Sequence, residues 1–263
     1  MGKNNIGIFD SGVGGTSIWR EIHELLPFED TMYLADSSNA PYGIKTKQEI
    51  IELSRKNTLK LLELGAKIIV VACNTATTNA IEELRNEFDI PIIGIEPAIK
   101  PAALKSKTKT IGILATKGTL SSSLFTKTSD LYTQGLKVIE VEGNGLVELI
   151  EAGKIYSEEM DKLLDDLLVP LKSNPIDYLV LGCSHYPYLI PKLKEKFSVD
   201  LSIIDSGEAV ARQTKAILEK EKILHTDFQQ KGTCIFYTNH DPKVLQNLVN
   251  DNNESFRVTH LDF

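Results

Sequence analysis

The sequence has few cysteines and none of the spacings in which cysteines serve a structural role. Only three occur among its 263 residues, at Cys73, Cys183 and Cys234. The count is odd, and the chain has no CxxC pair and no Cys/His ligand spacing, which argues against a disulfide framework and against a zinc site. We therefore expect free thiols in a reducing cytoplasm, and no bound metal.

Long apolar runs are also missing, and so is an excess of positive charge. No run approaches the roughly 20 apolar residues of a membrane-spanning helix, and the first segment, MGKNNIGIF, lacks a signal-peptide pattern. The net charge is −7 and the isoelectric point is near 5.4, so a nucleic-acid-binding surface is not favoured. We expect a cytoplasmic protein without membrane or nucleic-acid partners.

Nucleotide-binding signatures are incomplete. The segment DSGVGGTS at 10–17 contains Gly12 and Gly14, but Ser17 stands where a GxGxxG motif needs its last glycine. No GK[ST] follows a glycine-rich loop. A tight turn is the simpler interpretation of these glycines.

What the sequence has is a regular alternation of short apolar runs and longer amphipathic ones. Its composition, 42% hydrophobic and 25% charged, is that of a soluble globular protein. Continuous apolar strands between helices predict mostly parallel sheets covered on both faces. The expected strands are Ile6–Phe9, Thr31–Ala35, Ile68–Ala72, Ile92–Ile95, Thr110–Ala115, Lys137–Val141, Tyr178–Gly182, Leu201–Ile204 and Cys234–Thr238; the expected helices are Ser17–Leu26, Lys47–Leu64, Thr77–Glu87, Leu120–Leu131, Gly145–Ala152, Glu158–Leu171, Tyr188–Phe197 and Glu208–Glu221.

The chain also repeats itself weakly. IGIFDSGVGGTS at 6–17 resembles IGILATKGTLSS at 111–122, and IIGIEPA at 92–98 corresponds to SIIDSGEA at 202–209. The two strands that end on a cysteine lie at a similar offset. Three matches in one order indicate two related halves.

The repeat predicts an α/β fold of two pseudo-symmetric domains, each with a mostly parallel sheet flanked by helices. We expect residues 1–98 and 207–263 to form the first domain and 99–206 the second. Crossovers are expected at 99–104, where prolines interrupt the chain, and at 205–207. The active site should lie in the cleft between the domains, at the carboxyl ends of the strands.

Four strand-to-helix turns are candidates for ligand binding: DSGVGGTS at 10–17, CNTATT at 73–78, ATKGTLSS at 115–122 and CSHYP at 183–187. All are rich in hydroxyls and in backbone N–H groups at helix starts, which attract carboxylates or phosphates. Lys117 is their only cation. A small carboxylate ligand, which needs less positive charge than a phosphate-rich one, is favoured.

Two of the three cysteines stand in these turns. Cys234 falls inside an expected strand, where packing explains it. Cys73 and Cys183 each end a strand just before an expected helix, where the helix dipole should lower the thiol pKa from about 8.5 toward neutrality. Polar residues that can cap or donate hydrogen bonds follow directly: Asn74, Thr75, Ser184 and His185.

Two thiols on opposite halves suggest acid/base chemistry. A nucleophilic Cys183 with His185 as its base is one alternative, but it leaves Cys73 without a role. Two opposed thiols can instead remove a proton from one face of a carbon and return one to the other face. The stereocentre then inverts, and near-symmetric halves would handle near-mirror-image ligands.

At these residues the chain resembles the glutamate racemase family, within the wider aspartate/glutamate racemase group. The resemblance spans nearly the whole length. The main departure is Ser184, where the family usually has Thr, and the hydroxyl is kept. The motifs are FDSGVGG (9–15), ADSSNAPYG (35–43), VACNTAT (71–77), GIEPA (94–98), ATKGT (115–119), LVELIEAG (146–153), LGCSHYP (181–187) and IDSGEA (204–209).

The resemblance implies a cofactor-independent isomerase that interconverts L- and D-glutamate, the D-form being used for peptidoglycan. It implies that Cys183 abstracts the α-proton of L-glutamate and Cys73 protonates the other face. A homodimer is implied as well. The expected helpers of the thiols are Asp10, Glu151, His185 and Asp36, and the expected substrate contacts are Asp10, Ser11, Tyr42, Gly43, Asn74, Thr75, Thr116, Thr119, Ser184 and His185.

Simpler interpretations remain open for several of these residues. Asp10 could be a helix N-cap, Asp36 a turn residue, and Glu151 a solvated carboxylate. Glu151 and Tyr42 rest on the resemblance alone. For the whole chain the alternatives are a racemase for aspartate or a hydantoin, a non-catalytic amino-acid-binding protein, and a thiol redox protein. The lack of CxxC counts against the last, and nothing in this acidic chain indicates the gyrase inhibition reported for some glutamate racemases.

Overall fold

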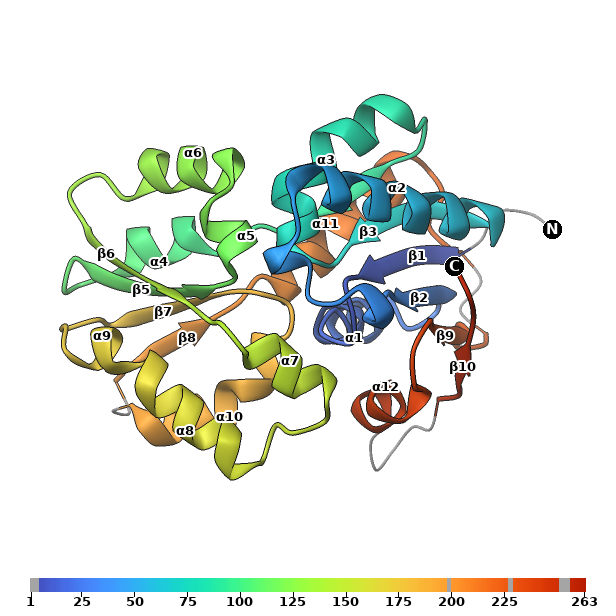
Figure 1. The fold of residues 1–263 in the computed structure, drawn as a ribbon. Helices are drawn as coiled ribbons and strands as arrows, with labels where there is room; N and C mark the ends of the chain where they lie inside the picture. Colours follow the sequence, from blue (N-terminus) through green and yellow to red (C-terminus); the bar gives the residue numbers. More distant parts are fainter. Residues whose placement is uncertain (1–4, 198–199, 227–228, 251–255) are drawn as a thin grey trace.

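The chain folds into two sheets that lie side by side (Figure 1). This computed structural model describes residues 5–197, 200–226, 229–250 and 256–263. Within these ranges strands and helices alternate along the chain, and all strand pairs are parallel. The α/β class and the parallel sheets are as the sequence predicts.

The larger sheet has six strands in the order β10-β9-β2-β1-β3-β4. Its central strand, β1, is buried from Ile6 to Asp10, on both faces. A parallel sheet covered on both sides requires such continuous apolar strands. The strands are β1 (Asn5–Asp10), β2 (Thr31–Ala35), β3 (Ala66–Val71), β4 (Ile92–Gly94), β9 (Cys234–Thr238) and β10 (Val258–His260).

The smaller sheet has four strands in the order β6-β5-β7-β8. The first four strands of the chain have the same order, β2-β1-β3-β4. The weak sequence repeat therefore corresponds to a repeated topology, in which β5 matches β1 and β7 matches β3. The strands are β5 (Thr110–Ala115), β6 (Lys137–Glu142), β7 (Tyr178–Gly182) and β8 (Ser202–Ile204).

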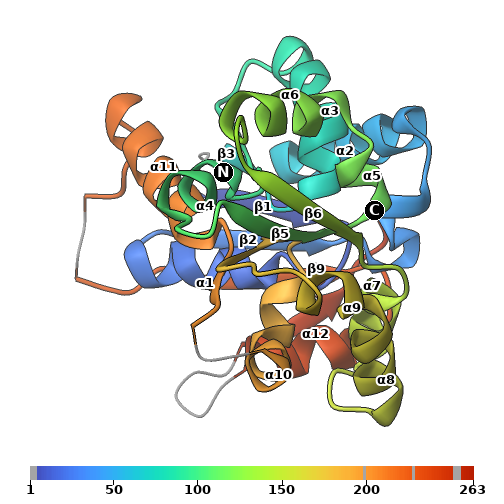
Figure 2. The ribbon, with the colours of Figure 1, turned by 90° about the vertical axis from the view of Figure 1, so that its left-hand side faces the viewer.

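Helices cover both faces of each sheet. Ile68 and Val70 of β3 pack in the core that contains α1 and α11, whereas Ile69 and Val71 face α2 and α3. In the smaller sheet, α4 and α6 lie on one side and α8 and α10 on the other (Figure 2). The α-helices are α1 (Thr16–Leu25), α2 (Lys47–Glu63), α3 (Asn74–Glu87), α4 (Ile99–Lys105), α5 (Lys117–Leu120), α6 (Ser123–Tyr132), α7 (Leu146–Glu151), α8 (Glu158–Leu167), α9 (Val169–Lys172), α10 (Ile190–Lys196), α11 (Gly207–Lys220) and α12 (Pro242–Val249), and the 3₁₀ turns are η1 (Ser37–Asn39), η2 (Tyr42–Ile44) and η3 (Tyr186–Leu189).

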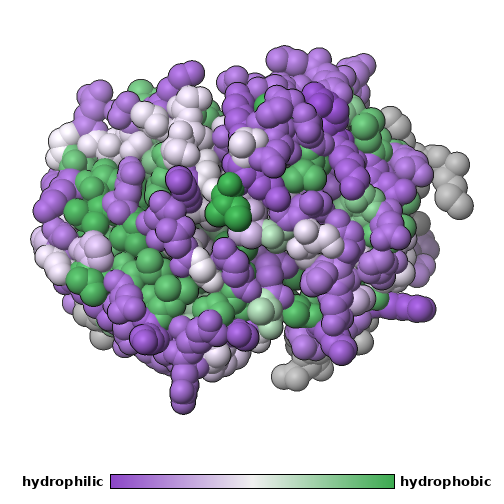
Figure 3. All heavy atoms as spheres, in the orientation of Figure 1, coloured by the Kyte–Doolittle hydropathy of each residue, from purple (hydrophilic) through white to green (hydrophobic). Residues whose placement is uncertain are grey.

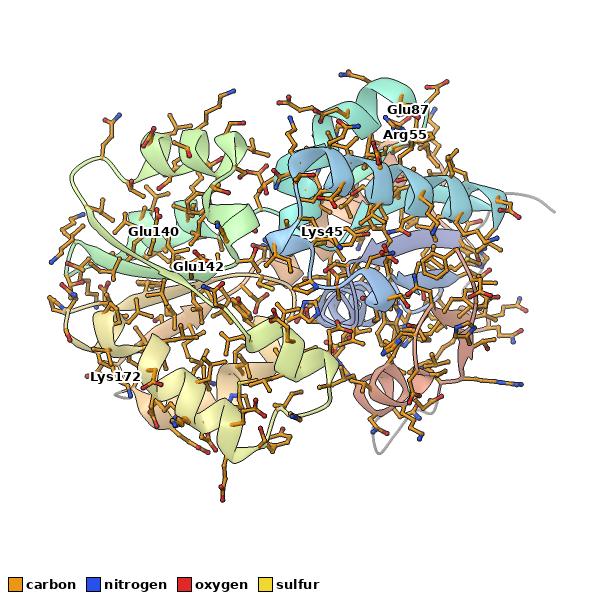
Figure 4. The ribbon with its side chains drawn as sticks, viewed as in Figure 1. Lys45, Arg55, Glu87, Glu140, Glu142 and Lys172 are labelled. Atoms are coloured by element: carbon orange, nitrogen blue, oxygen red, sulfur yellow. The ribbon has the colours of Figure 1, made fainter. Side chains whose placement is uncertain are left out.

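The outer faces of the helices over the larger sheet are polar. Figure 3 shows mainly hydrophilic residues over α2 and α3, and a group of apolar residues on the side of the smaller sheet. Arg55 of α2 lies 2.6 Å from Glu87 of α3, an ion pair that joins the two helices (Figure 4).

All nine expected strands are present, four of them with the expected bounds. The structure adds β10, α4 and α12. Residues 99–104, where a crossover between the domains was expected, form part of α4. Pro101 is the third residue of that helix, within the first turn, where a missing N–H breaks no intrahelical hydrogen bond.

Several helix bounds also differ from prediction. The expected helix from Leu120 to Leu131 is two helices, because the side chain of Ser122 accepts the Phe125 N–H and starts α6 anew. The expected helix from Glu158 to Leu171 also divides, into α8 and α9, but no side chain caps the start of α9. The helix expected from Tyr188 starts as the 3₁₀ turn η3. The predicted helix at Thr77 starts three residues earlier, because the Cys73 sulfur accepts the Ala76 N–H at 3.4 Å.

Candidate active site

The central strands of both sheets end at one cavity. Asp10 is the last residue of β1, Cys73 follows β3, Thr116 follows β5 and Cys183 follows β7. The cavity is small and is therefore suited to a small ligand. Its lining residues are Ser11, Pro41, Tyr42, Gly43, Cys73, Asn74, Thr75, Thr116, Val147, Cys183, Ser184 and His185.

Both strand-end cysteines are buried free thiols and line this cavity. Each comes from a different sheet, so the cavity lies between the two repeated halves. The third cysteine, Cys234, forms no disulfide, is the first residue of β9 and is not among the lining residues. The sequence pattern thus separated the two cavity thiols from the strand residue.

The environment of Cys73 corrects one expectation. Its sulfur lies at the start of α3, 3.6 Å from Ser11 Oγ, and both Ser11 and the Ala76 N–H lower the thiol pKa. Burial and the neighbouring Asp10 carboxylate outweigh them and raise the pKa of Cys73 above its ordinary value. The predicted shift toward neutrality is therefore wrong for this thiol.

Cys183 lies beside a histidine that carries charge. Its sulfur is 3.8 Å from His185 Nδ1. Burial alone lowers the pKa of His185, but contacts with Cys183 and Glu151 and the charge of Asp10 raise that pKa well above its ordinary value. The imidazole is then protonated at neutral pH, and a cation beside the sulfur stabilises negative charge on it.

Glu151 holds this histidine from a helix of the same half. It ends α7, and its Oε1 lies 2.6 Å from His185 Nε2. The same oxygen accepts the Val13 N–H at 2.6 Å, which ties α7 to the turn after β1. When the ring carries both protons, Nε2 donates to Glu151; the Gly14 N–H also lies 3.2 Å from this nitrogen. The solvated-carboxylate interpretation of Glu151 does not fit these contacts.

Asp10 lies behind the cavity wall, fully buried. Its Oδ2 accepts the Gly15 N–H at 2.9 Å, and its Oδ1 accepts the Ser184 hydroxyl at 3.1 Å. Burial raises the pKa of Asp10 above its ordinary value, and the nearby His185 opposes that rise. Asp10 therefore both orders its turn and connects it to the Cys183 side of the cavity.

Asn74 presents unused polar atoms to the cavity. Its side chain is 2% exposed, and neither its Nδ2 nor its Oδ1 has a hydrogen-bond partner among the described residues. Leaving a buried amide unpaired is costly. An amide that lines a cavity and lacks a partner can donate to a ligand carboxylate and accept from a ligand ammonium.

Three threonine hydroxyls connect the halves next to Asn74. Thr75 Oγ1 lies 2.8 Å from Thr116 Oγ1 and 3.3 Å from Thr119 Oγ1. Thr116 also caps α5 by accepting the Thr119 N–H. Thr119 is buried behind the lining, whereas Thr75 and Thr116 are part of it.

Tyr42 and Gly43 form the wall near Cys73. The Tyr42 hydroxyl donates to Asp36 Oδ2, and burial together with the Asp36 charge raises the pKa of Tyr42 well above its ordinary value. The phenol therefore stays protonated. In the described residues Asp36 is not among those that line the cavity. Its contacts favour a role in holding Tyr42.

Three residues at or near the cavity were not predicted from the sequence. Pro41 and Val147 line the cavity, and Tyr33 donates its hydroxyl to the Gly12 carbonyl at 2.7 Å. Pro41 and Val147 stand inside the quoted motifs ADSSNAPYG and LVELIEAG, which could have identified them. Tyr33 looked like an ordinary strand residue.

The described residues were also compared with two other kinds of feature, a metal site and a membrane-spanning helix. Within the described ranges, no group of three His, Cys, Asp or Glu side chains is arranged to hold a metal ion. None of the helices in the described part of the chain has both the length and the apolar character of a bilayer span.

Known proteins resemble this chain in sequence and in fold. The sequence model of the Asp/Glu/Hydantoin racemase family matches residues 6–214. A glutamate racemase of Herpetosiphon aurantiacus is 42% identical over 242 residues, which are 92% of this chain and 95% of that protein.

Solved structures are similar as well. A glutamate racemase of Bacillus anthracis superposes with a TM-score of 0.87 at 30% identity, covering 100% of this chain and 98% of that one. The Escherichia coli glutamate racemase, solved with L-glutamate and the activator UDP-MurNAc-Ala, gives a TM-score of 0.83 at 31% identity, with 98% and 97% covered. The chain therefore belongs to the Asp/Glu/Hydantoin racemase family and is an isomerase that acts as a racemase.

Proposed function

We propose that the chain racemises glutamate without a cofactor, using Cys73 and Cys183 as its two acid/base groups. The observation that carries the proposal is the pair of buried free thiols, one from each repeated half, lining one small cavity. The named relatives are glutamate racemases, which favours glutamate over other amino acids. Asn74 supplies unpaired polar atoms for the ligand.

The proposed reaction is a two-base inversion. With L-glutamate bound, the Cys183 thiolate takes the α-proton, so the Cα–H bond breaks and an S–H bond forms. The Cys73 thiol then gives its proton to the opposite face of Cα. The product is D-glutamate, with Cys183 left as a thiol and Cys73 as a thiolate. The reverse reaction uses the same groups in exchanged roles.

Neighbouring residues prepare each thiol for its part. Protonated His185, held by Glu151, stabilises the Cys183 thiolate. On the other side, burial and Asp10 raise the pKa of Cys73 and keep it a thiol, the form needed to donate. Asp10, tied through Ser184 to the opposite wall, is proposed as a helper of both thiols.

The α-proton of an amino acid is much less acidic than a thiol, so the cavity must lower the barrier. A small buried cavity excludes water and strengthens electrostatic contacts. Donors from Asn74 and Thr75 are suited to a carboxylate on which charge develops. Ser11, Tyr42, Gly43, Thr116 and Ser184 complete the proposed substrate contacts, with Thr119 behind them.

The test is racemisation of L-glutamate in deuterated water without pyridoxal phosphate. The wild type should incorporate deuterium at Cα of the inverted product, whereas Cys73→Ala and Cys183→Ala should not racemise. Cys234→Ala is the matched control and should keep full activity, because Cys234 lies in β9. Full activity in either of the first two variants would exclude the two-base mechanism.

Substrate choice is tested separately. Glutamate should react much faster than aspartate or a hydantoin, since the named relatives above 30% identity are glutamate racemases. Faster turnover of aspartate would favour the aspartate racemase alternative. Tight binding of glutamate without turnover would favour a non-catalytic binding protein.

We further propose the biological setting and the domain division. D-glutamate from this reaction would supply peptidoglycan synthesis in the cytoplasm, where the three cysteines stay reduced. The domains are proposed as 1–98 with 207–263, and 99–206. This division is supported by α4 packing on the smaller sheet and α11 packing on α1. A homodimer stays a prediction.

A further inference from the structure

The strand β9 ends beside the loop that leads to the candidate site. β9 pairs in parallel with β2, and Ala35 stands opposite Thr238. The residues that follow, Asp36 and Asn239, therefore lie next to each other at the carboxyl edge of the sheet. The family match ends at residue 214, so Asn239 belongs to a part of the chain that the family model does not match.

Asn239 makes three hydrogen bonds to this loop. Its Nδ2 donates to Asp36 Oδ1 at 2.6 Å. Its Oδ1 accepts the Ser38 N–H at 2.9 Å, and its backbone oxygen accepts the Ser38 hydroxyl at 2.5 Å. Both the side chain and the backbone of Asn239 thus fix the start of the loop.

Asp36 Oδ2 connects the residues held by Asn239 to the cavity wall. Asp36 Oδ2 accepts the hydroxyl of Tyr42, and Asn57 of α2 donates to that same hydroxyl oxygen at 3.1 Å. Asp36 and Tyr42 are both 1% exposed, so water does not compete for these contacts. Tyr42 and Gly43 line the cavity, whereas Asn239 is outside the described lining.

We infer that Asn239 is a positioning residue for substrate binding. It holds Asp36 and Ser38, and through Asp36 it sets where residues 42–43 stand in the cavity wall. The substrate in this inference rests on the proposed function, while the hydrogen-bond chain does not. Because Asn239 acts on a binding wall and not on the thiols, its loss should change KM more than kcat.

The test compares Asn239→Ala with Asp241→Ala. The control removes a carboxylate two residues further on, which accepts the Lys243 N–H at 3.0 Å and caps α12. Asn239→Ala should raise KM for both glutamate enantiomers at least about fivefold, with kcat within about threefold, since small displacements of a binding group are costly. Asp241→Ala should leave KM unchanged. A KM increase below about fivefold for Asn239→Ala overturns the inference.

A double-mutant cycle tests the route. Tyr42→Phe removes the hydroxyl that connects Asp36 to the cavity wall. In the Tyr42→Phe background, Asn239→Ala should therefore raise KM by a smaller factor than it does in the wild type. An undiminished effect overturns the proposed route. Asn239→Asp keeps the acceptor toward Ser38 but sets a second carboxylate against Asp36, and it should raise KM more than Asn239→Ala does.

A ligand-free measurement separates this inference from the proposed function. Amide hydrogen exchange of residues 36–43 should accelerate in Asn239→Ala and not in Asp241→Ala. Unchanged exchange overturns the positioning role whatever the substrate is. A wild type that does not racemise glutamate overturns the proposed function, and the exchange result then decides the positioning role alone.

Discussion

At the scale of single residues, burial and neighbouring charges set the pKa values of the residues at the cavity. Burial raises the pKa of Asp10 and of Cys73, whereas His185 is held protonated by its anionic and thiol neighbours. The two thiols therefore stand in different surroundings: a cation lies beside Cys183, and a carboxylate lies near Cys73. In the proposed reaction from L-glutamate, this asymmetry suits Cys183 to accept a proton and Cys73 to donate one.

Glu151→Gln tests the cationic side. The amide keeps the shape but accepts a weaker hydrogen bond than the carboxylate whose hydrogen bond raises the pKa of His185, so less of the imidazole is protonated. We expect kcat/KM to fall about 10- to 100-fold, the usual range for a group that supports acid/base catalysis. Since enantiomers have equal free energy in water, kcat/KM must fall equally in the two directions. Steady-state rates from each enantiomer check both points.

Glu148→Gln is the matched control. Glu148 lies on the same helix, α7, one turn earlier, and is exposed. Its loss should change kcat/KM less than about twofold. Equal losses in the two variants would mean that the charge of α7 in general is what matters, and not the contact with His185.

His185→Gln gives a prediction for stability against pH. The pKa of His185 is raised in the folded chain and ordinary, near 6.5, in the unfolded one. The folded state then binds the extra proton above pH 6.5, so this stabilisation is complete below that pH and is lost as pH rises toward the folded pKa. The difference in melting temperature between wild type and variant should be largest near pH 6 and shrink above it. A difference that grows with pH would contradict the raised pKa.

The sequence predicted which residues lie close together, but it did not predict the direction of every pKa shift. Strand ends at Cys73 and Cys183 follow from apolar runs, and parallel topology brings such ends together. The direction of the Cys73 pKa shift could not be read the same way. It depends on how completely the cavity is buried and on Asp10, which lies 63 residues earlier in the chain.

At the scale of elements, the turn after β1 is shaped to admit side chains from the other half. A Cβ added at Gly12 would lie 1.9 Å from Glu151 Oε1, and one at Gly14 would lie 2.2 Å from His185 Nδ1. The tight-turn interpretation of these glycines was incomplete. Their missing side chains also leave the space that the side chains of Glu151 and His185 occupy.

Gly12→Ala should therefore damage activity more than stability. The new methyl group displaces the Glu151 carboxylate, which weakens its contacts with His185 and Val13. We expect kcat/KM to fall at least about tenfold, with a stability loss of about 1–3 kcal/mol from overpacking. Racemisation rates and thermal unfolding measure the two effects.

Gly135→Ala is the control for a glycine lost elsewhere. Gly135 has φ of +77° and no atom near its added Cβ, so alanine there costs about 1 kcal/mol through backbone strain alone. Activity should be unchanged. If Gly12→Ala lost no more activity than Gly135→Ala, the turn would not be supporting Glu151.

Element types were predictable because each strand is a short apolar run between polar turns. The elements that differ have local causes that periodicity does not contain. A sulfur starts α3, and a proline in the first turn of α4 is harmless although it looked like a break. The expected repeat was visible because three matches kept one order, and the strand orders confirm it.

At the scale of the whole molecule, the cavity is too closed for free exchange of ligand. The centre of a water molecule can reach only about 10 Å³ of it. Contacts between the halves hold its walls together: Thr75 Oγ1 lies 2.8 Å from Thr116 Oγ1 in the lining, and behind it Asn79 donates to the Gly118 carbonyl at 3.0 Å. Gly43 also packs directly on Thr116. Glutamate can enter only if these contacts open, so a closing step is part of the proposed reaction.

Bound glutamate should therefore slow the opening that exposes the amides of 42–44 and 116–120. If the open form binds no ligand, ligand at ten times its dissociation constant lowers the open population about tenfold, and amide exchange in these segments slows by the same factor. The amides of α8, on the outer side of the smaller sheet, serve as the internal control and should exchange at an unchanged rate. Hydrogen exchange with and without D-glutamate measures this. Equal exchange in both states would mean that the cavity admits its ligand without separating the halves, and closure would not be a step of the mechanism.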